Sequence, residues 1–314
     1  MFFFALYDIN ILMLKDSKYR GIFGIPATPF NEDESLDLYS LEKVLDFTLN
    51  NGCHGIVMPV MASEYQSLTD EEKKIIFKTT AKIVDNKLPT VAGVTGVSDV
   101  HSIELAKYAE DIGFDSVITM PPHSMQPSQY QVKKFFSKIN DSINIPIWIQ
   151  NHPKGHPLSA DQLIELCNSF ENISLIKEET AYSGQMITNL IRGDLEKNIK
   201  SIMGGMGCMH LISEYARGAT GNMPASHYGD ILSKIWSLLD SGDEKQAIEI
   251  HNRMIPLINF EMIYGAPAFK EILVERKIIR SATTRSPGFR SFDEYDFTEL
   301  KKLMKTIEDL FDWR

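Results

Sequence analysis

The chain has 314 residues, of which 43% are hydrophobic and 24% are charged, as in an ordinary globular protein with enough apolar material for a core. The 32 Lys and Arg residues against 42 Asp and Glu give a net charge of -10, which argues against binding to nucleic acid or to an anionic membrane. The three cysteines lack the spacing of a disulfide scaffold or a zinc site, so we expect a cytoplasmic protein.

The N-terminal segment MFFFALYDINILML is apolar but shorter than the roughly 20 residues of a membrane span. It also lacks the basic start and the small-residue cleavage site of a secretory signal. We therefore expect residues 1–18 to be an N-terminal extension. It could be an extra strand, an arm packed on a neighbouring molecule, or the product of an upstream start codon.

From residue 19 onward, short apolar segments typical of strands alternate with longer segments of helical periodicity. The predicted strands cover residues 21–30, 55–60, 89–94, 116–121, 145–150, 173–179, 200–205 and 218–224. The predicted helices between them cover residues 38–50, 69–85, 99–112, 128–139, 159–170, 183–192 and 208–217. Glycines in segments such as NNGCHGI and EDIGFDSV end a helix just before the next strand.

Eight such units predict an α/β fold of the closed (β/α)8 TIM barrel type. An open doubly wound sheet fits less well, because no GxGxxG motif follows the first strand. After the eighth strand the pattern is wholly helical, with helices expected at 231–239, 244–262, 266–276 and 295–311. We expect the barrel to cover residues 19–240 and a C-terminal helical extension, packed on the barrel, to cover residues 241–314.

The sixth predicted strand ends with a lysine and two glutamates, Lys177-Glu178-Glu179. The active sites of such barrels lie at the C-terminal ends of the strands. Side chains alternate along a strand, so Lys177 and Glu179 share one face. A lysine in an apolar strand is costly to bury without a partner or a use. It could form a Schiff base with a carbonyl substrate, pair with Glu179, or extend its amine to solvent at the barrel mouth.

Other predicted strand ends offer groups that suit a small anionic substrate. Ala62 and Ser63 provide amides and a hydroxyl that could hold a carboxylate, and the glycine turn around Gly205 lets a ligand approach the backbone. His123 and His152 follow the fourth and fifth strands, where they could contact substrate hydroxyls. These positions favour the Schiff-base interpretation of Lys177.

Several motifs in this order resemble one enzyme family. They are PATPF at 26–30, LTDEE at 68–72, NHP at 151–153, IKE at 176–178 and GATG at 218–221. Over most of its length after residue 19, the chain resembles the dihydrodipicolinate synthase / N-acetylneuraminate lyase family of class I aldolases and dehydratases. The resemblance implies that Lys177 is the Schiff-base lysine and that the protein is a homotetramer.

The departures from the family pattern bear on the substrate. The family's glycine–threonine–threonine–glycine stretch is Val-Met-Ala-Ser at 60–63, so Ser63 is the expected substitute for the missing threonine. A tyrosine pair is replaced at 122–123, and the proton-shuttling tyrosine of the fifth strand falls at Gln150, which can orient a substrate but cannot titrate. The arginine that recognises the aldehyde partner of the synthases is not evident at 154–156, so condensation with aspartate semialdehyde is not expected.

Glu179 stands where the synthases usually have a small residue. Strand alternation places it about 6.5–7 Å along the face of Lys177, a suitable distance for a base acting on C3 or on a hydroxyl of a tethered substrate. Apolar walls would raise the pKa of Glu179 toward neutrality; the alternative is a charge partner with no proton-transfer role. The loss of the tyrosine with the gain of this glutamate resembles the subgroup that dehydrates 2-keto-3-deoxy sugar acids, such as 2-keto-3-deoxy-arabinonate.

We therefore expect a class I lyase that acts on a small 2-oxo acid and dehydrates a 2-keto-3-deoxy sugar acid, in which Lys177 forms an iminium and Glu179 moves a proton. Gln150 and Ser63 would orient the substrate. The covalent iminium implies no metal and no organic cofactor, and the expected partners are the substrate and further copies of the chain, not nucleic acid or a membrane. Retro-aldol release of pyruvate and a non-catalytic barrel that only binds 2-oxo acids stay open as alternatives.

Overall fold

The computed structural model describes residues 14, 16–122, 125–285 and 288–312. Most of the expected N-terminal extension at residues 1–18 lies outside the described residues, and so does His123. Among the helices of the described residues, none is both long and apolar enough to cross a membrane.

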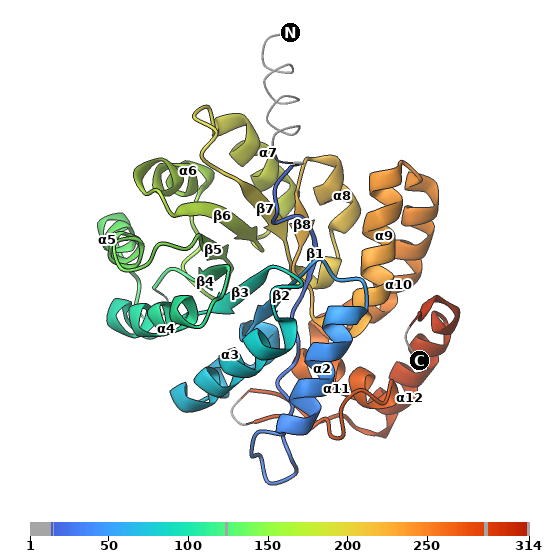
Figure 1. The fold of residues 1–314 in the computed structure, drawn as a ribbon. Coiled ribbons are helices and arrows are strands. Elements are labelled where there is room, and N and C mark those ends of the chain that lie inside the picture. The colour runs from blue at the N-terminus through green and yellow to red at the C-terminus, as the bar shows by residue number, and fades with distance from the viewer. Residues whose placement is uncertain (1–13, 15, 123–124, 286–287, 313–314) are drawn as a thin grey trace. The chain divides into compact units, whose positions relative to one another are not determined.

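Eight parallel strands form a closed barrel in the order β1 to β8 (Figure 1). They are β1 (Gly21–Gly24), β2 (Gly55–Met58), β3 (Thr90–Gly93), β4 (Ser116–Thr119), β5 (Ile147–Asn151), β6 (Ile173–Glu178), β7 (Ser201–Gly204) and β8 (Gly221–Asn222). The predicted (β/α)8 TIM barrel is thus confirmed. The first strand was predicted at 21–30 but ends at Gly24, and the following segment contains Pro26 and Pro29, which have no N–H to donate to a strand ladder.

Helices alternate with the strands and continue beyond β8. They are α2 (Leu38–Asn50), α3 (Asp70–Val84), α4 (Asp99–Asp111), α5 (Gln129–Asn140), α6 (Ala160–Ser169), α7 (Ser183–Gly193), α8 (Leu211–Ala216), α9 (Gly229–Ser241), α10 (Glu244–Tyr264), α11 (Ala266–Glu275) and α12 (Glu294–Lys305). Reciprocal hydrogen bonds at Thr69, Ser128 and Ser159 form capping boxes that start α3, α5 and α6. The predicted C-terminal helices are confirmed, although α12 is shorter than the expected 295–311.

The chain divides into two compact units. The first unit comprises the described residues up to Arg20 together with Pro89–Gly205 and His210–Met223. The second unit comprises Gly21–Leu88, Met206–Met209 and the described residues from Pro224 onward. The predicted division into residues 1–18, 19–240 and 241–314 stays a prediction.

In the first unit, α4 to α7 lie outside the strands β3 to β7 (Figure 1). Trp148 of β5 is fully buried, and its indole N–H donates to the Ser116 hydroxyl at 3.2 Å. The ring of Tyr19 meets the Trp148 indole edge to face, with 5.5 Å between the ring centroids. The large aromatic area and the satisfied N–H both stabilise this side of the barrel.

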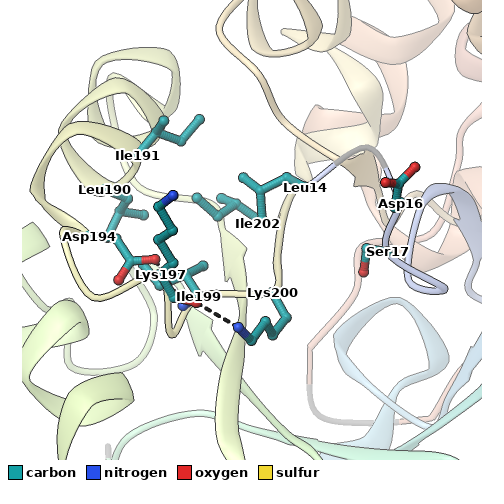
Figure 2. A pocket seen from close by; sticks show the side chains of 10 residues that line it. All are labelled: Leu14, Asp16, Ser17, Leu190, Ile191, Asp194, Lys197, Ile199, Lys200 and Ile202. Atoms are coloured by element: carbon teal, nitrogen blue, oxygen red, sulfur yellow. Dashed lines mark hydrogen bonds between the residues drawn. The ribbon is translucent and has the colours of Figure 1, made fainter. Parts of the chain in front are cut away.

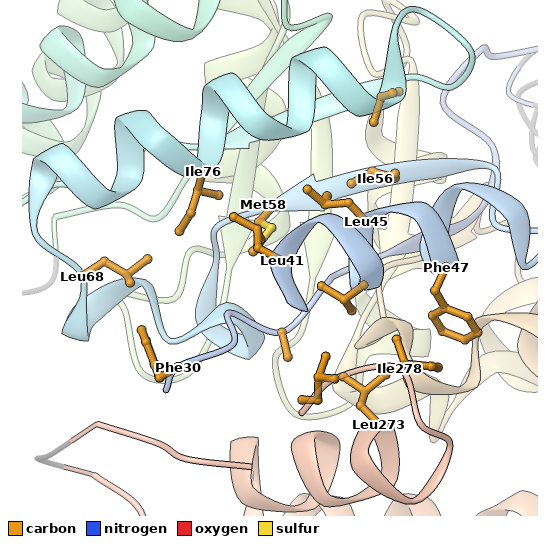
Figure 3. Close-up of a cluster of buried hydrophobic side chains, with 14 residues drawn as sticks. Phe30, Leu41, Leu45, Phe47, Ile56, Met58, Leu68, Ile76, Leu273 and Ile278 are labelled. Atoms are coloured by element: carbon orange, nitrogen blue, oxygen red, sulfur yellow. The ribbon is translucent and has the colours of Figure 1, made fainter. Parts of the chain in front are cut away.

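The second unit has a hydrophobic core that joins α2, β2 and α11 (Figure 3). Leu41 and Leu45 of α2 lie one helical turn apart and point to the same face, which is fully buried. Leu273 of α11 and Ile278 pack into the same cluster. Each such buried aliphatic side chain stabilises the fold by about 1.5–3 kcal/mol relative to exposure. The C-terminal helix α11 is therefore an integral part of this unit.

Candidate functional site

The three residues expected to be catalytic converge on one carboxylate oxygen in the first unit. Lys177 Nζ lies 3.1 Å from Glu179 Oε2, and Gln150 Nε2 donates to the same oxygen at 2.8 Å. All three side chains are buried. A lysine, a carboxylate and an amide are thus held together at the carboxyl ends of β5 and β6, where catalytic groups of such barrels lie.

Strand register explains why these side chains meet. Gln150 is the register partner of Lys177, and Asn151 is the register partner of Glu178. Alternation sends the first pair to one face and the second pair to the other, where Asn151 Nδ2 donates to Glu178 Oε2 at 2.8 Å. Glu179 N donates to Asn151 O at 2.8 Å, which fixes Glu179 just past the end of β6.

The ionisation of Glu179 differs from the expectation. Burial by itself would raise the pKa of Glu179, but the Lys177 ammonium, His152 and the hydrogen bond from Gln150 together hold that pKa below its usual value. The expected rise toward neutrality is therefore wrong for the protein without substrate. Glu179 is a carboxylate across the neutral pH range and is ready to accept a proton.

His152, expected to contact substrate, directly follows β5 and is half-buried. Its Nδ1 accepts a hydrogen bond from the backbone N–H of Lys154 at 2.9 Å, so the neutral ring carries its proton on Nε2. Burial lowers the pKa of His152, with Glu179 acting against this shift and Lys177 reinforcing it. The neutral ring can therefore offer an N–H donor next to the charged pair, and its contact with substrate stays a prediction.

Gly205 has a role that the sequence did not suggest. A Cβ atom on Gly205 would lie 2.2 Å from Glu179 Oε1, well inside van der Waals contact. Glycine at this position therefore makes room for the Glu179 carboxylate. The expected approach of substrate to the Gly205 backbone stays a prediction.

We expect Gly205→Ala to lower kcat by about 10²-fold, because displacing a reacting group by about 1 Å has effects of that size. Gly193→Ala is the matched control: its Cβ would meet only the flexible end of the Ile164 side chain. Steady-state kinetics of both variants, measured with a 2-oxo acid that the wild-type protein turns over, provide the test. Equal activity of the two variants would contradict the packing argument.

The expected carboxylate-binding residues lie in the second unit, in a short 3-10 helix, η1 (Met61–Ser63). Ser63 is buried, and its hydroxyl donates to Pro26 O at 2.7 Å, while Thr28 donates to Ser63 O at 2.6 Å. The Ser63 N–H donates to Val60 O at 2.9 Å. Both Ser63 donors are therefore already engaged within the second unit, and substrate binding by Ala62 and Ser63 stays a prediction.

Lys270 and Glu214 are among the buried charged groups that sequence reasoning missed. Lys270 of α11 lies with its Nζ 2.5 Å from Glu64 Oε1, and both side chains are fully buried. Glu214 of α8 is likewise almost fully buried, in the first unit. A charge on the apolar face of a predicted helix is the signal that could have found Lys270, because Ala266 and Leu273 lie on the same face by helical spacing.

A separate pocket of about 230 Å³ in the first unit contains none of the predicted site residues (Figure 2). Its lining includes Leu14, the end of α7 around Leu190, and Lys200 and Ile202. Lys200 Nζ donates to Lys197 O at 2.6 Å. Lys200 directly precedes β7, so this pocket lies at the amino end of that strand, whereas Lys177 is near the carboxyl end of β6.

Comparison with known proteins decides the family. The model of the dihydrodipicolinate synthetase family matches residues 18–307. The chain belongs to this family. The resemblance expected from the motifs is thereby confirmed, and at the family level the expectation of a lyase-type enzyme is supported.

Curated members of the dihydrodipicolinate synthetase family with similar sequences carry two different activities. L-2-keto-3-deoxyarabonate dehydratase of Azospirillum brasilense is 27% identical over 277 residues, which are 86% of this chain and 89% of that protein. The 4-hydroxy-tetrahydrodipicolinate synthase of Methanocaldococcus jannaschii is 27% identical over 259 residues, which are 79% of this chain and 85% of that protein. Equal identities do not decide between dehydratase and synthase.

Solved structures of the family share the fold. Dihydrodipicolinate synthase from Rhodopseudomonas palustris superposes with a TM-score of 0.86 at 24% identity, covering 92% of this chain and 98% of that one. YagE, an E. coli K12 prophage protein of the same family solved with pyruvate, gives a TM-score of 0.86 at 22% identity, covering 92% and 99%.

Proposed function

We propose that this protein is a Schiff-base lyase that dehydrates a 2-keto-3-deoxy sugar acid, such as 2-keto-3-deoxy-arabinonate. The observation that supports this most is the single Glu179 oxygen that contacts both Lys177 Nζ and Gln150 Nε2, at 3.1 and 2.8 Å. This contact provides a carboxylate base, Glu179, beside the Lys177 amine, and the fifth strand supplies the Gln150 amide at the same site. Similarity to the Azospirillum brasilense dehydratase is in keeping with this choice.

The first step forms the covalent adduct. The Lys177 ammonium passes a proton to Glu179, and the free amine attacks C2 of the 2-oxo acid. The resulting carbinolamine takes that proton on its oxygen and loses water, which leaves a cationic iminium. The iminium is an electron sink and makes the C3 hydrogens acidic.

The second step eliminates the hydroxyl group. The Glu179 carboxylate takes a proton from C3, and the electron pair forms an enamine. Glu179 then returns the proton to the C4 hydroxyl, which leaves as water while the enamine electrons form a C3–C4 double bond. Hydrolysis of the iminium releases the unsaturated product and frees Lys177. In this scheme Gln150 holds Glu179 in place, and the His152 Nε2–H is a donor for a substrate hydroxyl.

Retro-aldol cleavage uses the same adduct. Glu179 would take the proton of the C4 hydroxyl instead, and the C3–C4 bond would break with its electrons moving into the iminium, which gives an aldehyde and an enamine. Glu179 would then return the proton to C3 of the enamine, and hydrolysis of the resulting iminium would release pyruvate and free Lys177. The two reactions therefore differ in their products, and product analysis separates them.

Borohydride trapping followed by peptide mass spectrometry tests the proposal, with pyruvate and a panel of 2-keto-3-deoxy sugar acids as ligands. We expect a reduced adduct on Lys177, none with Lys177→Met, and loss of water from the correct sugar acid. Lys270, another buried lysine, is an internal control for non-specific reaction. A folded protein that gives no Lys177 adduct with any 2-oxo acid would refute the Schiff-base mechanism. Turnover that yields pyruvate would identify the aldolase instead.

A further inference from the structure

Glu214 links three elements of the first unit, α7, α8 and β8. It belongs to α8, and its side chain is almost fully buried. Its Oε1 accepts a hydrogen bond from the Ser183 hydroxyl of α7 at 2.6 Å, and its Oε2 accepts one from Asn222 Nδ2 of β8 at 2.9 Å. Ser183 begins the helix that directly follows the lysine strand, so Glu214 ties this helix to β8.

Two neighbouring glycines connect Glu214 to the site. A Cβ atom on Gly204 would lie 1.9 Å from Glu214 Oε2, and a Cβ atom on Gly205 would lie 2.2 Å from Glu179 Oε1. Adjacent residues of an extended chain face opposite sides. The Gly204–Gly205 backbone is therefore packed between the two carboxyl groups.

The charges in this region disfavour an ionised Glu214. Burial is the main cause that raises the pKa of Glu214 to about 7; the hydrogen bond from Ser183 opposes the rise, and the carboxylates of Glu178 and Glu179 add to it. The hydroxyl of Ser183 can accept as well as donate a hydrogen bond, so the contact persists when Glu214 is neutral. Arg217, the residue that directly follows α8, donates to Thr188 at 3.0 Å.

We propose that Glu214 is a positioning residue of the Schiff-base site, which as a neutral acid holds the Gly204–Gly205 backbone against Glu179 and on ionisation lowers turnover. This inference rests on the proposed function for its kinetic readout. Ionisation adds a third carboxylate charge beside Glu178 and Glu179, and their repulsion acts across the Gly204–Gly205 backbone. Glu214 touches neither substrate nor Lys177 in this scheme and acts through Glu179.

The pH dependence of kcat/KM, measured with the 2-oxo acid that is turned over, tests the inference. A group with a pKa of about 7 is about 90% ionised at pH 8, so we expect wild-type kcat/KM to fall about tenfold there from its plateau at lower pH. Glu214→Gln imitates the neutral acid and is expected to keep its plateau through pH 8. Ser183→Ala removes the hydrogen bond that lowers this pKa and is expected to move the fall to higher pH.

A control variant and a stability measurement show whether a changed pH profile is specific to Glu214. Glu271 on α11 is another carboxyl whose pKa is raised by burial. The control variant Glu271→Gln is therefore expected to have the same pH profile as the wild type. The Tm of Glu214→Gln, measured at each pH, shows whether this variant is folded. If Glu214→Gln does not fold, the pH profile of Ser183→Ala tests the inference instead. A wild-type fall near pH 7 that persists in both variants would overturn the inference alone. Absence of a Lys177 adduct in the wild type would overturn the proposed function and this inference with it.

Discussion

Replacing Glu179 with glutamine is expected to lower kcat by about 10²–10⁴-fold, the usual contribution of a positioned acid–base group. Glutamine keeps the size of the side chain and an oxygen that can accept from Gln150, but it cannot take up a proton. Because Glu179 also relays the Lys177 proton in the proposed first step, Lys177 should capture pyruvate more slowly, but the borohydride-reduced adduct should still accumulate on long incubation. A large loss of turnover with retained capture would separate a proton-transfer role from a merely structural ion pair.

The neighbouring glutamate provides the matched control. Glu178 points to the opposite face of β6, where it accepts hydrogen bonds from Asn151 Nδ2 at 2.8 Å and from Thr180 N at 2.7 Å. Burial raises the pKa of Glu178. Glu178→Gln is therefore expected to cost much less turnover than Glu179→Gln. Exchange of the C3 protons of pyruvate in deuterated water, followed by NMR, isolates the deprotonation step. Normal exchange in Glu179→Gln would show that another group is the base.

Two buried carboxyl groups, Glu179 and Glu214, are expected to affect the pH dependence of turnover in different pH ranges. The pKa of Glu179 lies below its usual value, since the Lys177 charge outweighs the effect of burial. Glu179 is thus already ionised well below neutral pH, and kcat/KM, which reports the free enzyme, should show no Glu179 transition near pH 7. By the inference above, a transition there would belong to Glu214, whose pKa burial raises to about 7.

The sequence predicts well those features of the fold and the site that depend on local periodicity. The alternation of strands and helices defined the barrel, and period-two alternation placed Lys177 and Glu179 on one face. The convergence of Gln150 on the same oxygen was not predicted, because it depends on the register of β5 against β6, in which Gln150 is the partner of Lys177. The extent of the first strand was overestimated because its apolar run continues through Pro26 and Pro29, and hydrogen bonding, not hydrophobicity, ends a strand.

What the sequence could not predict depends on contacts between distant segments. The sign of the Glu179 pKa shift follows from the 3.1 Å contact with Lys177, whereas burial alone gives the opposite sign. Gly205 looked like an opening for a ligand, and only the three-dimensional packing shows that it accommodates Glu179. Glu214 carries no motif, and its importance arises from partners on two other elements.

Lys270→Met is expected to destabilise the protein by about 3–5 kcal/mol, because removing one partner of a buried ion pair leaves an uncompensated charge. Glu64 is fully buried, and Lys270 Nζ lies 2.5 Å from its Oε1. Lys270 also donates to Thr283 O at 2.7 Å and lies 4.3 Å from the centroid of the Phe30 ring. The lysine thus neutralises the carboxylate that follows η1 and joins it to α11 and the segment after it.

Denaturant unfolding of a small set of variants measures this effect. The double variant Glu64→Gln/Lys270→Met removes both charges and is expected to recover most of the lost free energy of unfolding, since neither charge remains buried alone. Lys301→Met is the control: its exposed pair with Glu275, at 3.3 Å, is expected to contribute less than about 1 kcal/mol. If Lys270→Met lost no more than Lys301→Met, the buried pair would not stabilise the protein, and α11 would be held to the segment after β2 by apolar packing.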